Sequence, residues 1–170
     1  VALPELPKKQ IKIGSLYYQA VDDGTSVEVA EGEYNFTGVD IPSKIKYKGY
    51  EYPVTSIGSS AFTFCKKLKT ITIPTSVTSI GHGAFVGCDN LTSVTIPNSV
   101  TSIGEDAFKW CEKLKTITIP NSVTSIGSNA FYLCEKLKTI TIPNSVTSIG
   151  TAAFRYCDHL TSITILNGVT

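Results

Sequence analysis

One pattern recurs five times along this chain, and each copy begins 23 residues after the previous one, as Ile80 follows Ile57 (80 − 57 = 23). A copy contains TSIG, AF, C, L, TIP and SV in that order, with variable residues between them. A period of about 20 to 50 residues is typical of a solenoid, whose units stack on one another. Stacked copies build a broad surface and seldom a single catalytic pocket. The period therefore predicts a solenoid that is not an enzyme. Its most regular markers are Ile57, Ile80, Ile103, Ile126, Ile149, Cys65, Cys88, Cys111, Cys134 and Cys157.

Each copy contains a short strand and a segment with helix-like spacing. Ile71 and Ile73 alternate with threonines, which predicts a strand that Pro74 ends because proline has no N–H to donate. Residues 82–91 place apolar side chains at helical intervals, which predicts one or two turns of α or 3-10 helix. Gly81 precedes this segment and permits either an unusual backbone angle or a close approach.

The predicted stack is curved. Parallel strands pair about 4.8 Å apart, whereas helices are about 10 Å wide. Strands on one side and helices on the other side would bend the stack, with the strands on the concave side. The outward strand residues then form that face, and they are the first candidates for partner binding: Thr70, Thr72, Ser93, Thr95, Thr116, Thr118, Thr139, Thr141, Ser162 and Thr164.

The position before each cysteine gives a second candidate surface. It is bulky in four of the five copies, with Phe64, Trp110, Leu133 and Tyr156, and Tyr132 lies beside it, whereas the second copy has Gly87. Trp and Tyr are typical of binding hot spots, so Phe64, Trp110, Tyr132 and Tyr156 form a candidate contact patch. The alternative is that these rings only cover the gaps between coils.

Composition excludes several classes of partner. The 170 residues fit one domain, and a net charge of +1 argues against nucleic acid or an anionic membrane as the main partner. No apolar run of about 18 residues is present, so we expect no direct membrane insertion. The chain begins with Val1 and contains no Met, which favours a processed or trimmed chain.

No metal, cofactor or catalytic site is predicted. The cysteines are not paired two to four residues apart as in zinc motifs, so we expect free buried thiols, with a disulfide or a soft metal as weaker alternatives. His82 and His159 occupy positions held elsewhere by solvent-facing residues. The Asp22-Asp23-Gly24 turn lacks the further ligands of a calcium loop.

The two ends depart from the repeat. We expect a flexible tail over residues 1–10, an N-terminal β cap over 11–56 and five repeats over 57–170. At the other end, Leu166 replaces the proline and Gly168 the serine. Ile163, Ile165 and Val169 would then be exposed on the last coil. Either a cap has been removed or two molecules meet there, and the second alternative predicts a weak end-to-end dimer.

Leu68, Ile71 and Ile73 match the LxxLxL core of leucine-rich repeats. The full pattern over 5 × 23 = 115 residues resembles the BspA-like, or Treponema pallidum, type of leucine-rich repeat. The resemblance implies an α/β repeat fold: a right-handed leucine-rich-repeat solenoid with parallel strands on the concave side and short α or 3-10 turns on the convex side. An Asn that follows the strand in the wider superfamily is here a serine, and we expect its hydroxyl to bond the turn backbone: Ser76, Ser99, Ser122 and Ser145.

The resemblance also implies a secreted or cell-surface protein, often of a host-associated bacterium, linked to adhesion to host matrix or other cells. The leading hypothesis is a non-catalytic module that binds protein, or else glycan, through its concave face and flank. A structural spacer in a larger surface protein is the alternative. Ice binding by the Thr-x-Thr rows is a minor alternative, because lysines border that face.

Overall fold

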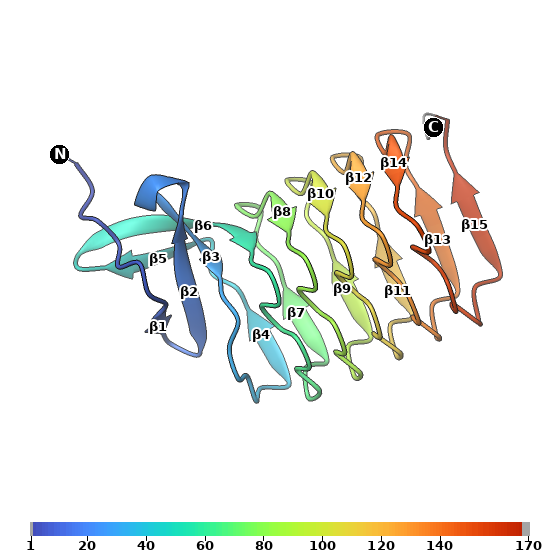
Figure 1. Ribbon diagram of the computed structural model, residues 1–170, viewed down its shortest axis with the longest axis horizontal. Coiled ribbons are helices and arrows are strands. Elements are labelled where there is room, and N and C mark those ends of the chain that lie inside the picture. Colours follow the sequence, from blue (N-terminus) through green and yellow to red (C-terminus); the bar gives the residue numbers. More distant parts are fainter. Residues whose placement is uncertain (1, 168–170) are drawn as a thin grey trace.

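The computed structural model describes residues 2–167 and shows a β-solenoid of stacked coils (Figure 1). We number coils 1 to 5 from the isoleucines at 57, 80, 103, 126 and 149. One row of parallel strands carries the TIT segments and the segments equivalent to them in the other coils. Its members are β4 (Gly38–Asp40), β7 (Thr70–Thr72), β9 (Ser93–Thr95), β11 (Thr116–Thr118), β13 (Thr139–Ile142) and β15 (Ser162–Ile165).

A second row of parallel strands carries the TSI segments. It contains β6 (Tyr50–Ile57), β8 (Ser79–Ile80), β10 (Ser102–Ile103), β12 (Ser125–Ile126) and β14 (Ser148–Ile149). Ile103 pairs with Ile80 on one side and Ile126 on the other. This register, in which each residue meets its equivalent 23 positions away, confirms the predicted stacking.

The first row is interrupted between coils 3 and 4. β4, β7, β9 and β11 form one sheet and β13 pairs with β15, but within the described chain β11 and β13 are not hydrogen-bonded to each other. Thr118 pairs with Thr95, and Thr141 pairs with Thr164. The row therefore consists of two ladders that lie next to each other.

The predicted helices are absent from the coils, and that prediction is wrong. Residues 82–91 form a series of turns, and within residues 2–167 the only helix is η1, a 3-10 helix at Asp22–Gly24. The backbone takes left-handed φ values twice in each coil, for example at Gly83 (62°) and Gly87 (67°). A left-handed residue cannot continue a right-handed helix, so each one ends a turn and starts the next.

The turn segments are bonded to one another across the coils. Phe62 N–H donates to the Ala84 carbonyl at 2.7 Å, and Phe85 N–H donates to the Ala107 carbonyl at 2.8 Å. Backbone bonds of this kind hold the turns at strand-like spacing. The wide helices on which the predicted bending depended are therefore missing. We call the outward side of the first row of strands the threonine face.

A column of phenylalanine rings forms the centre of the core. Phe62, Phe85, Phe108, Phe131 and Phe154 follow one another with ring centroids 5.0 to 5.4 Å apart. The rings from Phe85 onward are nearly parallel, with interplanar angles of 4° or less. The first four rings are fully buried, and Phe154 in the last coil is partly buried.

The cysteines form a parallel column of free thiols, as predicted. From coil 2 onward each Sγ donates to the phenylalanine carbonyl of the preceding coil, as Cys111 does to Phe85 at 3.2 Å. Burial raises the pKa of the Cys65 and Cys157 thiols to about 11, and it raises the pKa of the three between them further. The thiols therefore stay protonated at neutral pH and are poor nucleophiles.

The glycine that follows each isoleucine is required by close approach. A Cβ at Gly127 would lie 2.4 Å from the Glu105 nitrogen and 2.5 Å from the Gly104 carbonyl carbon. Real Cβ atoms essentially never lie so close to another heavy atom. The sequence left two explanations for this glycine, an unusual backbone angle or a close approach between backbones, and the close approach applies.

The serines after the strands do not behave as predicted. Only Ser99 donates a hydrogen bond, and its acceptor is the Val77 carbonyl of the preceding coil. The hydroxyls of Ser76, Ser122 and Ser145 are buried without a hydrogen-bond partner. The turn needs no such bond because the backbone closes it: Pro120 C=O accepts the Val123 N–H at 3.1 Å.

Ser99→Ala and Ser122→Ala are therefore expected to differ in effect. Loss of the Ser99 bond should lower the free energy of unfolding by about 1 kcal/mol, the usual net value of one hydrogen bond. Ser122→Ala removes a buried hydroxyl with no partner and should be neutral or stabilising. Urea unfolding of both variants measures the difference, and equal losses would contradict it.

The N-terminal part is mainly antiparallel. β1 (Ile11–Ile13), β2 (Leu16–Val21) and β3 (Ser26–Val29) follow one another, β3 joins β6, and β5 (Lys44–Tyr47) forms a hairpin with β6. Within the predicted tail, Leu6 is buried and the Pro4 carbonyl accepts a hydrogen bond from the Tyr52 hydroxyl at 2.6 Å. Capping of the core by these strands remains a prediction.

The last strand of the first row is exposed. Ile163 and Ile165 in β15 are 43% and 57% exposed, as expected, whereas Val169 lies outside the described residues. Within residues 2–167 no helix has the length and apolarity needed to cross a bilayer.

Candidate functional site

The threonine face presents short hydroxyl side chains at regular positions. All ten candidate residues on it are exposed, while the isoleucines and valines between them point into the core in β7, β9, β11 and β13. This in–out alternation is what the period-two pattern predicted. Hydroxyls can donate and accept hydrogen bonds, so this face suits a polar ligand.

Two shallow hollows interrupt the threonine face. One, of about 360 Å³, lies where β11 and β13 are not hydrogen-bonded, and its lining includes Thr118 and Thr139. The other, of about 570 Å³, lies along the strand ends and includes Pro97, Asn98 and Asn121. Both hollows combine apolar strand ends with polar turn residues.

The second candidate surface is a row of rings on the turn side, and we call Phe64, Trp110, Tyr132 and Tyr156 the aromatic row. The sequence suggested that Gly87 breaks it. In the structure the Phe64 ring leans over Gly87, where a Cβ would lie 2.4 Å from the Phe64 Cδ1. Phe64 thereby reaches Trp110, with ring centroids 6.3 Å apart and an angle of 30°. Gly87 therefore allows the Phe64 and Trp110 rings to meet across coil 2.

Two cations complete the aromatic row. The Lys109 ammonium lies 5.0 Å from the Trp110 ring centroid and 5.6 Å from that of Tyr132. Tyr132 meets Tyr156 edge to face at 5.3 Å, and the Arg155 guanidinium lies 4.8 Å from the Tyr156 ring. Each contact is within the range of a cation–π or aromatic pair.

Three of the four residues of the aromatic row have an unfavourable backbone conformation. Phe64, Trp110 and Tyr156 have φ values of 55°, 62° and 60°. Such angles suit glycine and are outliers for bulky residues, at about 1 to 2 kcal/mol each. The same three side chains are 53%, 36% and 46% exposed, so a large part of each ring remains available to a partner.

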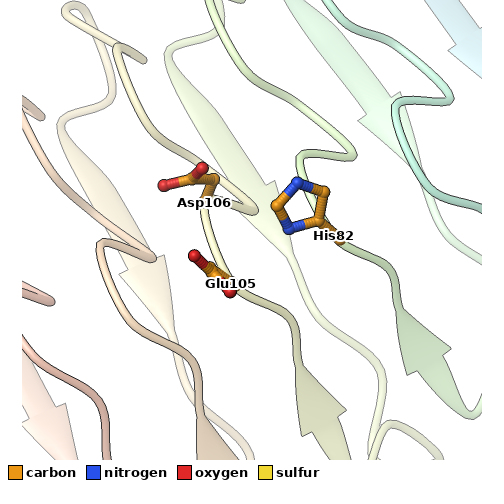
Figure 2. Close-up of side chains that lie close together, drawn as sticks. All are labelled: His82, Glu105 and Asp106. Carbon is orange, nitrogen blue, oxygen red and sulfur yellow. The ribbon is translucent and has the colours of Figure 1, made fainter.

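One cluster was missed by the sequence interpretation. His82 and Glu105 lie on neighbouring coils with Asp106 beside them (Figure 2). One ligand atom from each lies within 4.8 Å of the others. The signal was available, because 105 − 82 = 23 residues places His82 and Glu105 at the same position of adjacent coils. The sequence interpretation placed His82 among solvent-facing residues and did not consider that a Glu at the same position of the next coil would lie beside it.

The repeat has a recognised counterpart. The pattern of the BspA-type leucine-rich repeat region matches residues 55–170 in six copies. No curated protein shows detectable sequence similarity to the chain.

Several solved structures share the fold. A leucine-rich repeat protein from Bacteroides ovatus is 38% identical with a TM-score of 0.85, over 91% of this chain and 40% of that one. The T. pallidum leucine-rich repeat protein is 32% identical with a TM-score of 0.82, over 91% and 71%. A leucine-rich cell surface protein from Faecalibacterium prausnitzii is 28% identical with a TM-score of 0.58, over 95% and 55%.

This chain therefore spans less than half the length of the B. ovatus protein. The matched region covers most of the chain and includes all five coils. Its fixed residues are those that form the core of the coils: the isoleucines, phenylalanines, cysteines and leucines. The chain belongs to the BspA-type leucine-rich repeat family.

Proposed function

We propose that this chain is a non-catalytic binding module, secreted or at a cell surface, that recognises a protein partner through its aromatic row and threonine face. The observation that carries the proposal is the aromatic row. Its Phe64, Trp110 and Tyr156 side chains stay partly exposed at backbone positions that glycine adopts at lower cost, as Gly87 does in coil 2. Exposed aromatic side chains gathered on one surface are typical of protein-binding sites.

The composition of the aromatic row favours a protein partner over a glycan. Trp, Tyr and Arg are the residues most enriched among binding hot spots. The rings also stack on one another along the row, as Phe64 does with Trp110, which leaves fewer free ring faces for a sugar. The surface location is supported by the similar F. prausnitzii protein, which is described as a cell surface protein.

A binding assay with two variants tests the proposal. The chain is immobilised and exposed to matrix and cell-surface proteins, and the captured partner is then measured against Trp110→Ala and against the triple variant Thr95→Lys, Thr118→Lys and Thr141→Lys. Loss of a hot-spot ring should weaken binding by about 2 kcal/mol or more. Lysines on the threonine face should abolish any contact made there.

Thr151→Lys is the matched control, because Thr151 is also exposed but lies on the turn side. It should bind like the parent chain. Full binding by both test variants would exclude both surfaces and would favour the spacer hypothesis.

The exposed β15 edge supports an additional partner, a second copy of this chain. Within the described residues β15 pairs only with β13, and Ile163, Ile165 and Leu166 are exposed beside it. An unpaired strand edge with apolar side chains is a template for pairing with another chain. Analytical ultracentrifugation over a range of concentrations should detect a weak dimer that Ile165→Lys abolishes, and a monomer at every concentration would contradict the proposal.

A further inference from the structure

We propose that His82, Glu105 and Asp106 bind a divalent transition-metal ion, with Zn²⁺ as the best fit, and that this ion links coil 2 to coil 3. The three side chains offer one imidazole nitrogen and two carboxylate oxygens, all within 4.8 Å of one another. Within the described residues no other group of three His, Cys, Asp or Glu side chains meets this criterion.

The backbone of the solenoid holds the three ligands in position. His82 C=O accepts the Ser60 N–H at 2.8 Å, and Glu105 C=O accepts the Gly83 N–H at 2.9 Å. Asp106 N–H donates to the Ser128 carbonyl at 2.9 Å. Each ligand residue is therefore bonded to an adjacent coil, so the stack fixes the backbone positions from which the three side chains extend.

The surroundings of the Asp106 carboxylate also favour a bound cation. Its Oδ1 is buried and accepts no hydrogen bond, and the Lys109 ammonium lies 3.5 Å away as an ion pair. A shielded carboxylate oxygen without hydrogen-bond donors is best stabilised by a cation. Lys109 supplies that charge in part, but it also lies over the rings of Trp110 and Tyr132.

The ligand set distinguishes between metals. Ca²⁺ prefers six to eight oxygen ligands and Mg²⁺ retains several waters, so an imidazole disfavours both. One imidazole with two carboxylates suits Zn²⁺, with water at the remaining position. His82 and Glu105 are exposed and Asp106 is partly buried, so the side chains can rotate to close on the ion and solvent can complete its coordination.

The chain contains a matched control histidine. His159 is exposed like His82, but its Nδ1 lies 2.7 Å from the Glu135 carbonyl, and it belongs to no such cluster in the described chain. A comparison of the two histidines separates a built site from nonspecific binding to surface imidazole.

Isothermal titration of Zn²⁺ into the full, tag-free chain tests the proposal, together with thermal unfolding. The parent chain should bind one ion and unfold at a higher temperature in its presence, because the ion joins two coils. His82→Ala should weaken binding by at least about tenfold, the loss seen even when residues that merely support a ligand are removed. His159→Ala should leave affinity and the shift in unfolding temperature unchanged.

Lys109→Gln provides a test in the opposite direction. Removal of the ammonium that competes for Asp106 should strengthen Zn²⁺ binding, whereas a purely structural effect would weaken it. Circular dichroism without metal confirms that each variant folds. The proposal is overturned if Zn²⁺ does not bind, if the two histidine variants lose affinity equally, or if Ca²⁺ binds as tightly as Zn²⁺.

Discussion

Replacement of Phe108 with alanine is expected to lower the free energy of unfolding by about 3 to 5 kcal/mol, the range for a buried aromatic side chain. Phe108 is fully buried and packs between Phe85 at 5.0 Å and Phe131 at 5.4 Å. The substitution removes two stacked contacts and leaves a cavity between rigidly bonded coils. Denaturant unfolding with linear extrapolation measures the loss.

Phe154→Ala is the matched control at the end of the column. Phe154 is partly buried, and in the described chain its only ring contact is with Phe131 at 5.4 Å. Its replacement should be clearly less destabilising than that of Phe108. A smaller loss at Phe108 than at Phe154 would mean that the coils collapse to fill the central cavity, contrary to a stack held at fixed spacing.

Much of the core was predictable because the period identifies equivalent residues. A side chain that recurs every 23 positions must stack on its copies, so Ile103 meets Ile80 and Phe108 meets Phe85. The strands, their parallel register and the buried free thiols all follow from that one fact. The first row of strands also begins one strand before coil 1, at β4, where Ile41-Pro42 repeats the end of the TIP motif.

The prediction of a helix on the turn side was wrong because the spacing of apolar residues is ambiguous. Ala84, Phe85 and Cys88 fit a helical face, but a series of turns buries the same residues. The deciding signal lay at the position before AF, where Gly83, Asp106 and Asn129 stand. Gly, Asp and Asn are the residues that most readily adopt left-handed φ, and each of these three does so here.

The candidate site was only partly predictable for a different reason. Its members could be named from the sequence, but their contacts depend on where side chains point. Gly87 looked like a gap in the aromatic row because the pattern shows only that a side chain is missing there. In the structure the missing Cβ is what allows Phe64 to reach Trp110.

Gly127→Ala is expected to destabilise the protein by at least about 3 kcal/mol, the upper range for overpacking. The added Cβ would lie 2.4 Å from the Glu105 nitrogen and 2.5 Å from the Gly104 carbonyl carbon. Both obstacles are backbone atoms, which cannot rotate aside as a side chain can. Relief requires coils 3 and 4 to separate, and that would stretch the bond from Gly127 N–H to the Ile103 carbonyl, now 2.8 Å.

Gly49→Ala is the control that separates backbone strain from the clash between coils. Gly49 lies in the hairpin turn between β5 and β6 with φ at 85°, and a Cβ there would have no atom within 4 Å. Its replacement should reduce stability by about 1 to 2 kcal/mol through backbone strain alone. Gly127 has no left-handed φ, so its larger loss would come from the clash between coils. If Gly127→Ala were the milder of the two in denaturant unfolding, the coils could not be packed backbone against backbone at this position, and the glycine of the repeat would need another explanation.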